Sequence, residues 1–398
     1  MTAGIVIVGA GLAGHSAATG LRAAGYDGRL TLIGAETRAP YDRPPLSKAA
    51  LTDAAEPLPA WLMDPGTADA FKAEVYRGVT ALRLDRAAKT ILPSDGSSIP
   101  YEKLLLATGA KPRKLTIPGG ELALLLRNFE DAQALRAQLR PERRIVIVGG
   151  GFIGLELAAS AIRRGCKVTL VEAQPRILMR GVPEAIARLV HERHAAAGVD
   201  LLTGVGLAAI DAAAVHLADG REIRYDVLVA GIGAAPETRL AEAAGLAIEN
   251  GIAVDAALRT SDPDIFAAGD CCSFPHPLFG DTRIRLEAWR NAQDQGMHVA
   301  QNLLGAGRKY TSVPWFWSDQ HDLSLQVAGL PALGPATIER KPMPGTLVLF
   351  HLTAEGRLVG AGGIGIGNAV ARDIKLGEML IAKARTPIRQ RWLTPPFR

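Results

Sequence analysis

Short apolar runs alternate along the chain with segments of helical or loop-like pattern, and this alternation predicts parallel strands joined by helices. The first run, at 5–8, consists of β-branched residues and passes at once into a glycine-rich turn and a helical pattern. The same plan returns at 145–148, where the sequence IVIVGxG is repeated. The spacing between the copies is too long for a solenoid or propeller repeat, so we expect two separate copies of one α/β unit.

A second apolar run follows each copy and ends in an acidic residue. RLTLIGAE ends at Glu36, and CKVTLVEA reaches Glu172. Two later runs, LLLATGAKPR at 104–113 and VLVAGIGAAP at 227–236, each predict a buried strand that leaves through a glycine turn. Because these two runs share one plan, we expect both to mark crossings between lobes.

The crossings predict a first domain that is interrupted by a second one. We expect residues 1–110 and 234–308 to form the discontinuous domain, and residues 111–233 to form the inserted domain. Residues 309–398 are expected to form a smaller α+β domain, with strands near 323–330, 346–352 and 357–366 and a helix over 372–383. The glycine cluster at 360–367 lacks a following strand that ends in an acid, so it predicts a strand and turn.

The composition is that of a folded globular protein, with 48% hydrophobic and 21% charged residues. The three cysteines, Cys166, Cys271 and Cys272, are too few for a disulfide framework and indicate a reducing compartment. No leader-like segment precedes the first strand, and the apolar run at 145–155 is too short to span a bilayer. We therefore expect a cytoplasmic protein without a membrane segment.

The formal net charge is +5 and the isoelectric point is near 9.2. This balance is compatible with a mildly basic solvated surface or with one that attracts an acidic partner. Nucleic acid is not an expected partner, because no dense Lys/Arg run or stacking motif is visible. His191 and His194 have a spacing that could suit a metal, but nothing completes such a site. We expect a solvated amphipathic helix there and no metal.

Both copies carry the pattern G-x-G-x-x-G between strand and helix, formed by Gly9, Gly11 and Gly14 and again by Gly149, Gly151 and Gly154. The first glycine permits a tight turn, the second lets the backbone approach a pyrophosphate, and the third lets helix and strand pack closely. The acid that ends the next strand can hold ribose hydroxyls. Since both copies have all of these features, we predict two dinucleotide sites.

The two sites need not hold the same cofactor. The Glu172 carboxylate would bond a ribose diol and repel a 2′-phosphate, which favours NADH, whereas Arg176 and Arg180 keep NADPH open as an alternative. Asp270 follows a short predicted strand and can bond a ribityl hydroxyl of a flavin dinucleotide. The alternative for Asp270 is a helix-capping role.

Five motifs give the whole chain a resemblance to a known family: PYDRPPLSK at 40–48, GGGFIGLELA at 149–158, GIGAAP at 231–236, AAGDC at 267–271 and PWFWSDQ at 314–320. The chain resembles the FAD-dependent NADH:ferredoxin reductases that serve bacterial Rieske-type aromatic dioxygenases and cytochrome P450 systems. The resemblance implies a glutathione-reductase-like α/β fold, with two Rossmann-type dinucleotide-binding domains and a C-terminal α+β domain. It also implies transfer of electrons from NADH through FAD to an acidic [2Fe–2S] ferredoxin in a transient complex.

The motifs and the resemblance together give a set of expected site residues. FAD is expected at Gly9, Gly11, Ala13, Gly14, Glu36, Arg43, Lys48, Val79, Arg127, Asp270 and Trp289. NAD is expected at Gly149, Gly151, Phe152, Ile153, Gly154, Glu156, Glu172, Arg180 and Gly233. By the resemblance, Lys48 and Glu156 approach the flavin and the nicotinamide and are the catalytic pair. Relatives commonly carry Asp where this chain has Ala35, so Glu36 is expected to take the ribose contact.

Three other activities compete with ferredoxin reduction. Rubredoxin reduction and direct NADH oxidation use the same cofactors, and an NADH-sensing interaction protein resembling apoptosis-inducing factor would use NADH mainly to alter association. Disulfide reduction is not expected, because PYDRPPLSK contains no cysteine and a vicinal Cys271–Cys272 disulfide would be strained.

Two features of the C-terminal region have both a functional and a structural interpretation. Trp317 lines the electron route to the ferredoxin by the resemblance, or else fills the interface between the flavin and C-terminal domains together with Trp289 and Trp315. A set of basic residues near the C-terminus could add positive charge where an acidic ferredoxin docks, or could simply form a solvated helix face. These residues are Arg372, Lys375, Lys383, Arg385 and Arg389.

Overall fold

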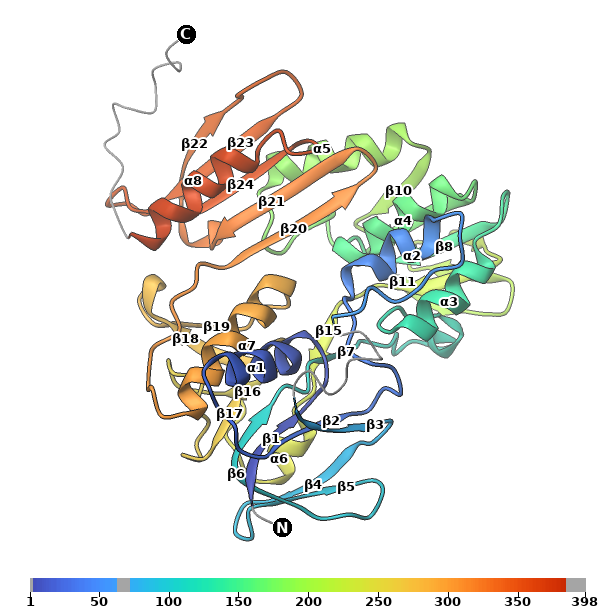
Figure 1. Ribbon diagram of the computed structural model, residues 1–398. Helices are drawn as coiled ribbons and strands as arrows, with labels where there is room; N and C mark the ends of the chain where they lie inside the picture. The colour runs from blue at the N-terminus through green and yellow to red at the C-terminus, as the bar shows by residue number, and fades with distance from the viewer. Residues whose placement is uncertain (1–2, 63–71, 384–398) are drawn as a thin grey trace. The chain divides into compact units, whose positions relative to one another are not determined.

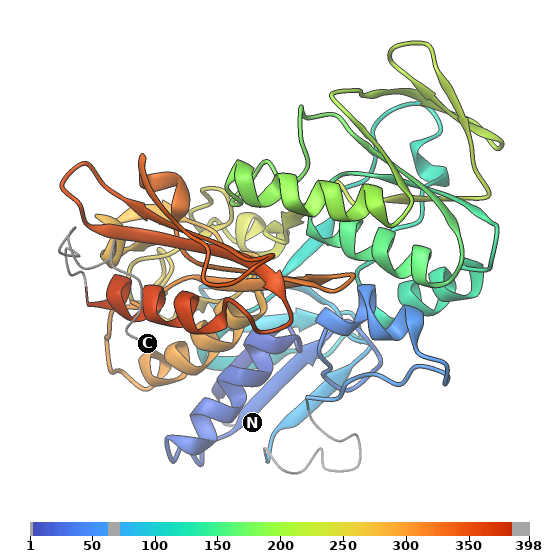
Figure 2. The ribbon, with the colours of Figure 1, turned by 90° about the horizontal axis from the view of Figure 1, so that it is seen from above.

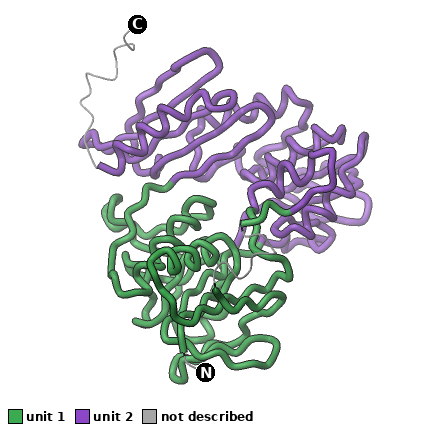
Figure 3. Tube along the Cα trace, viewed as in Figure 1, with its two compact units in different colours: residues 1–42, 59–111, 235–314 green, residues 43–58, 112–234, 315–398 purple. Residues whose placement is uncertain are grey.

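The computed structural model describes residues 3–62 and 72–383. The chain divides into two compact units, which Figure 3 distinguishes by colour. Unit 1 comprises residues 1–42, 59–111 and 235–314, and unit 2 comprises residues 43–58, 112–234 and 315–398. The three domains expected from the sequence do not match these two units one to one, and their boundaries stay a prediction.

Unit 1 is built on a mostly parallel sheet whose central strands are mainly apolar. Its order is β3 (Glu74–Arg77), β2 (Leu30–Gly34), β1 (Gly4–Val8) and β6 (Ile99–Leu106), and β17 (Ile265–Ala267) pairs in parallel on the far side of β6. β5 (Thr90–Pro93) and β4 (Ala81–Asp85) extend the sheet with antiparallel pairing. Every residue of β1 and β2 is buried, as expected for strands covered on both faces.

Two helices of unit 1, α1 (Leu12–Ala23) and α7 (Trp289–Leu303), pack against each other (Figure 1). Small residues permit this close approach, since a Cβ on Gly296 would lie 2.4 Å from the Ala13 carbonyl oxygen. The smaller elements of unit 1 are α6 (Arg239–Ala243), β16 (Ile252–Ala253), β18 (Cys272–His276) and β19 (Thr282–Ile284). β7 (Ala110–Pro112) and β15 (Ala234–Pro236) stand at the points where the chain passes from one unit to the other.

Unit 2 contains a second parallel sheet, which repeats the plan of the first. Its order is β10 (Val199–Thr203), β9 (Lys167–Glu172), β8 (Arg144–Val148) and β14 (Val227–Ala230). Its helices are α3 (Phe129–Gln138), α4 (Phe152–Arg163) and α5 (Glu184–Ala196), and an antiparallel sheet is formed by β11 (Leu207–Ile210), β12 (Ala214–Leu217) and β13 (Glu222–Arg224). The segment at 43–58, which also belongs to unit 2, contains a 3-10 turn at Pro44–Ser47 and the short helix α2 (Ala49–Thr52).

The C-terminal part of unit 2 is a five-stranded antiparallel sheet. Its order is β20 (Trp315–Gln320), β21 (Leu323–Gly329), β24 (Leu358–Ile366), β23 (Leu347–Leu352) and β22 (Ala336–Arg340). Helix α8 (Ala371–Ala382) lies along one face of this sheet, as Figure 2 shows. The expected strands near 323–330, 346–352 and 357–366 and the expected helix are confirmed, and the glycine cluster at 360–367 lies mainly in β24. The strands β20 and β22 were not expected from the sequence.

Candidate functional site

The turn between β1 and α1 has the shape that an extended anion requires. Gly9 has φ +116°, and a Cβ there would lie 2.0 Å from the Ala107 carbonyl oxygen. A Cβ on Gly14 would lie 1.9 Å from the Gly9 carbonyl oxygen. At Gly11, in contrast, the described residues leave open space for 4 Å around such a Cβ. The first and third glycines are therefore fixed by packing, and the middle one faces a free space at the N-terminus of α1.

The turn between β8 and α4 repeats this geometry in unit 2. Gly149 has φ +111°, and a Cβ there would lie 2.5 Å from the Gly231 carbonyl oxygen. A Cβ on Gly154 would lie 2.0 Å from the Gly149 carbonyl oxygen. The nearest atom to a Cβ on Gly151 is 4.0 Å away, so the middle glycine again borders free space. Phe152 and Ile153 open the helix, and Ile153 is exposed.

Glu172 holds its carboxylate beside the second glycine turn. The backbone N–H of Gly150 donates to Oε2 at 2.7 Å, and the N–H of Gln174 donates to Oε1 at 2.7 Å. Arg176 is occupied elsewhere, because its guanidinium donates to the carbonyl oxygens of Ile177, Leu178 and Val182.

Arg180 is the second arginine that follows Glu172. Its Nη2 lies 3.1 Å from where a Cβ on Gly233 would be, and Gly233 has φ +93°. The structure thus brings Glu172 to the second glycine turn and sets Arg180 beside Gly233.

The other residues expected around FAD fall into both units. Glu36 follows β2 and accepts a hydrogen bond from the Tyr41 hydroxyl at 2.5 Å, and the N–H of Val79 donates to the carbonyl of Gly34. Gly269, directly before Asp270, lies against the first turn of α1, since a Cβ there would be 3.0 Å from the Ala13 Cβ. In unit 1 the structure therefore brings Glu36, Val79 and Asp270 to the carboxyl ends of the parallel strands.

Trp289 begins α7, and its indole N–H donates to Asp42 at 2.6 Å. Arg43, Lys48 and Arg127 belong to unit 2. There the Arg43 guanidinium donates to the Arg127 carbonyl oxygen at 2.6 Å.

Lys48 and Glu156 meet in unit 2, as the catalytic pair expected from the resemblance should. Glu156 lies on α4 and is only 5% exposed, and Lys48 Nζ lies 2.9 Å from its Oε1. The Ser318 hydroxyl donates to the same oxygen at 2.6 Å, and the Ser47 hydroxyl donates to Oε2 at 2.5 Å. Three donors therefore converge on one buried carboxylate and hold it in a single orientation.

Sequence reasoning missed the two serines of this centre. Ser47 lies in PYDRPPLSK and Ser318 in PWFWSDQ, so both stand inside motifs that had been singled out for other residues. The Ser160 hydroxyl, one turn of α4 beyond Glu156, donates to the Ser47 carbonyl oxygen at 2.6 Å and fixes that segment to the helix.

A solvated amphipathic helix was expected at His191 and His194; α5 is such a helix, but His194 lies on its buried face. The residue is 1% exposed, and burial lowers the pKa of its imidazole to about 4. Within the described residues, no group of three or more metal-ligating side chains is present. His194 instead hydrogen-bonds Gln320 of the C-terminal sheet, with 2.9 Å between Nε2 and Oε1.

The cysteines offer no redox-active pair. Cys271 and Cys272 are free and buried, and burial raises the pKa of both thiols. Cys166 is also free and buried. An uncharged thiol is a poor nucleophile, so these residues do not support disulfide exchange.

Trp315 and Trp317 lie on β20, Arg372 and Lys375 lie on α8, and Lys383 follows the end of α8. Trp317 stacks on Trp315 with ring centroids 5.4 Å apart, and its indole N–H donates to Asp319. Lys375 forms an ion pair with Glu378, also on α8, at 3.2 Å. Arg385 and Arg389 lie outside the described residues.

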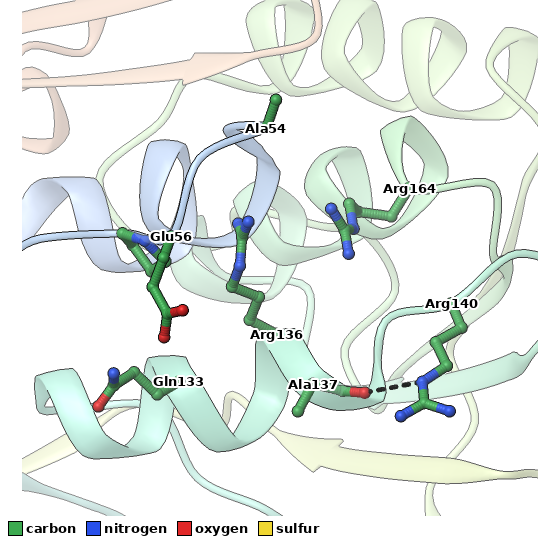
Figure 4. Close-up of a pocket in the computed structure, with 8 residues that line it drawn as sticks. Ala54, Glu56, Gln133, Arg136, Ala137, Arg140 and Arg164 are labelled. Atoms are coloured by element: carbon green, nitrogen blue, oxygen red, sulfur yellow. Dashed lines mark hydrogen bonds between the residues drawn. The ribbon is translucent and has the colours of Figure 1, made fainter.

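A separate pocket of about 360 Å³ lies in unit 2 between the segment at 54–57, α3 and the end of α4 (Figure 4). Arg136 donates to the carbonyl oxygens of Ala50, Asp53 and Ala55, and Arg140 donates to that of Ala137. Arg136 thereby ties the segment to α3, whereas the bond of Arg140 is local. None of the residues expected at the two nucleotide sites lines this pocket.

Comparison with known proteins defines the class. Residues 3–296 match the family model described as pyridine nucleotide-disulphide oxidoreductase, and residues 315–396 match the model described as reductase C-terminal. The chain belongs to the pyridine nucleotide-disulphide oxidoreductase family. The glutathione-reductase-like α/β fold predicted from the sequence is confirmed.

The particular relatives are reductases of electron-transfer systems. The chain is 41% identical over 397 residues to the anthranilate 1,2-dioxygenase system ferredoxin–NAD(+) reductase component of Burkholderia cepacia, covering 98% of this chain and 97% of that protein. It is 41% identical over 332 residues to rubredoxin–NAD(+) reductase of Pseudomonas putida, covering 82% and 86%. The reductase in a crystal structure of a covalent putidaredoxin reductase–putidaredoxin complex matches with TM-score 0.90 and 34% identity, covering 97% and 94%. The predicted resemblance is confirmed.

Proposed function

We propose that the chain binds FAD and NADH and transfers electrons from NADH to a [2Fe–2S] ferredoxin that feeds a Rieske-type aromatic dioxygenase or a P450. The observation that carries this proposal is the pair of glycine turns, each with its middle glycine open to a pyrophosphate. The full-length likeness to a dioxygenase-system reductase supports the choice of electron acceptor. FAD, when bound, accepts two electrons from a reduced nicotinamide and can release them singly to an iron–sulfur cluster.

We assign the first glycine turn to FAD and the second to NADH. The helix N-terminus at each turn supplies backbone N–H groups and a positive dipole end to a pyrophosphate. Glu172, already held at the second turn, receives the adenosine ribose hydroxyls and disfavours a 2′-phosphate. The Arg176 guanidinium is engaged with backbone carbonyls, which leaves Arg180 as the arginine beside the NADH turn.

The remaining assignments follow the family likeness. Residues 1–110 and 234–308 form the FAD domain, 111–233 the NAD domain, and 309–398 the C-terminal domain. Lys48 supplies a fixed positive charge where electrons arrive, and Glu156 holds that charge in place through the ion pair at 2.9 Å. Glu36, Asp270 and Trp289 serve the FAD site.

The partner is an acidic ferredoxin, bound transiently, and the location is the cytoplasm. A net charge of +5 favours an acidic partner through long-range steering. The three free, buried cysteines agree with a reducing compartment. In the part of the chain that the structure describes, no helix is both long enough and apolar enough to cross a membrane.

NADH-dependent reduction of cytochrome c tests the function. Adding a [2Fe–2S] ferredoxin should raise the rate strongly, and a rubredoxin should raise it less. Rubredoxin reduction is the second candidate, favoured by the likeness to rubredoxin–NAD(+) reductase. If neither protein raises the rate, ferredoxin reduction is refuted. If turnover is negligible while NADH changes the oligomeric state, the sensor function takes its place.

A further inference from the structure

A continuous chain of hydrogen bonds runs within unit 2 from the Glu156 carboxylate to the turn between β20 and β21. Ser318 Oγ lies 2.6 Å from Glu156 Oε1, and Gln320 Nε2 lies 3.0 Å from Ser318 Oγ. Gln320 Oε1 lies 2.9 Å from His194 Nε2, and His194 Nδ1 lies 3.2 Å from His321 Nε2. Ser318, Gln320 and His194 are each at most 3% exposed. The chain therefore links α4, β20 and α5 through a buried region.

The carboxylate fixes the direction of every bond in this chain. An ionised carboxylate only accepts, so the Ser318 hydroxyl must donate to it and accept from the Gln320 amide N–H. The Gln320 carbonyl then accepts from His194, which places the proton of that ring on Nε2. His194 Nδ1 is consequently a lone pair and accepts from Nε2–H of His321. All the donors point toward Glu156, so its negative charge polarises the whole series.

The protonation states of the two histidines agree with this direction. Burial lowers the pKa of His194 to about 4 and also lowers that of His321, so both rings are neutral near pH 7. A second proton on His194 Nδ1 would meet the N–H of His321 and break the chain at that link. The ring centroids are 4.5 Å apart in an edge-to-face contact, which fixes the orientation of both rings.

The chain orients Glu156 and does not conduct protons. A side-chain amide does not exchange its N–H protons in series with its carbonyl, so Gln320 interrupts any proton path. We propose that Ser318, Gln320 and His194 are positioning residues that fix the orientation of the Glu156 carboxylate toward Lys48, with His321 closing the chain at its outer end. This inference rests on the catalytic role proposed above for Glu156. It adds residues of α5 and the C-terminal sheet to that centre.

The first measurement is the tautomeric state of the histidines, which does not depend on activity. Long-range ¹H–¹⁵N NMR of the holoprotein with ¹⁵N-labelled histidine should show the Nε2–H tautomer for both His194 and His321. The variants H194Q and H321Q assign the two signals by their loss. An Nδ1–H tautomer at His194 would overturn the proposal, because that form cannot donate to Gln320.

The second measurement compares S318A, S318T and the matched control S324A. Ser324 is also a buried serine of the same sheet, on β21, outside the chain of bonds. Loss of one hydrogen bond to a charged group should lower kcat for NADH-dependent ferricyanide reduction about tenfold in S318A. The KM for NADH should change less than twofold, because the Ser318 hydroxyl bonds to Glu156 and Gln320 and is not itself among the residues expected to contact NADH. S318T keeps the hydroxyl and should recover most of the rate, and S324A should match the wild type.

A purely structural role predicts different results. S318A would then match S324A in kcat, or S318T would fail to restore the rate, and either result overturns the proposal. If S318A does not fold, H194L and H194Q test the far end, since only H194Q keeps a donor near the Nε2 position. The kcat of H194L should fall further than that of H194Q, and equal kcat values for the two variants would refute the inference. If E156Q turns over NADH normally, the proposed role of Glu156 fails, while the tautomers still decide whether the chain exists.

Discussion

Acid should destabilise this protein through His194 in a way that a single substitution can remove. The ordinary imidazole pKa of 6.5 falls to about 4 in the folded protein, mainly because the ring is buried. Below pH 6.5 the unfolded chain therefore binds a proton that the folded one excludes. The contribution of the neutral His194 ring to stability is fully present above pH 6.5 and is lost as the pH falls toward 4.

The size of the loss in unfolding free energy follows from the lowered pKa of His194. A fall in the pKa of His194 from 6.5 to about 4 corresponds to about 3 kcal/mol of unfolding free energy at the acid limit. At pH 5 the loss is about 2 kcal/mol. His321 packs against His194 and has a lowered pKa as well, so it contributes in the same direction. Arg193 and His191 lower the pKa of His194 further, and Asp322 is paired with Arg193 at 2.5 Å.

Urea unfolding at pH 7.5 and at pH 5.0, monitored by tryptophan fluorescence, measures the loss of unfolding free energy between the two pH values. Trp315 and Trp317 lie on β20, the strand that also carries Gln320, so they report on this sheet. In H194Q, which does not titrate, the difference between the two pH values should shrink by about 2 kcal/mol. H191Q, one turn earlier on α5, should nearly keep the wild-type difference, because His191 is the smallest of the causes that lower the pKa of His194. If H194Q keeps the wild-type pH dependence, His194 is not the group that excludes the proton.

Four further substitutions test the nucleotide sites and the charged pair. Gly14→Ala should lower the melting temperature by several degrees, because its Cβ would lie 1.9 Å from a carbonyl oxygen, whereas Gly11→Ala should keep the melting temperature and reduce bound FAD measured by absorbance. Glu172→Ala should raise the KM for NADH about tenfold and that for NADPH much less, and equal losses would exclude the ribose contact. Lys48→Met leaves the Glu156 carboxylate with one donor fewer, and it should lower both kcat and the melting temperature in calorimetry.

The fold was largely predictable because its signals are local. Apolar runs followed by glycine turns mark β1 and β8, and a positive φ at Gly9 and Gly149 is a requirement that the sequence displays directly. The strands β20 and β22 were missed for a local reason as well. β20 contains two tryptophans and three polar residues, and β22 is mostly exposed, so neither reads as an apolar run.

The polar centre around Glu156 was only half predictable, because its members come from distant parts of the chain. The ion pair with Lys48 followed from the family resemblance, but no spacing rule connects Glu156 with Ser318, which stands 162 positions away. His194 illustrates the same limit, since the period of α5 shows that it shares a face with Ile186, Ala187 and Val190 without showing what covers that face.

One signal in the sequence could nevertheless have located Ser318. A strand alternates its side chains between two faces, so PWFWSDQ read with a period of two places Phe316, Ser318 and Gln320 together. The structure agrees: Ser318 and Gln320 are buried, and Phe316 meets Phe152 of α4 with ring centroids 5.0 Å apart. A buried face of β20 that carries a hydroxyl and an amide needs polar partners on whatever packs against it. Glu156, an acid near the start of a buried helix, was the partner that the sequence already offered.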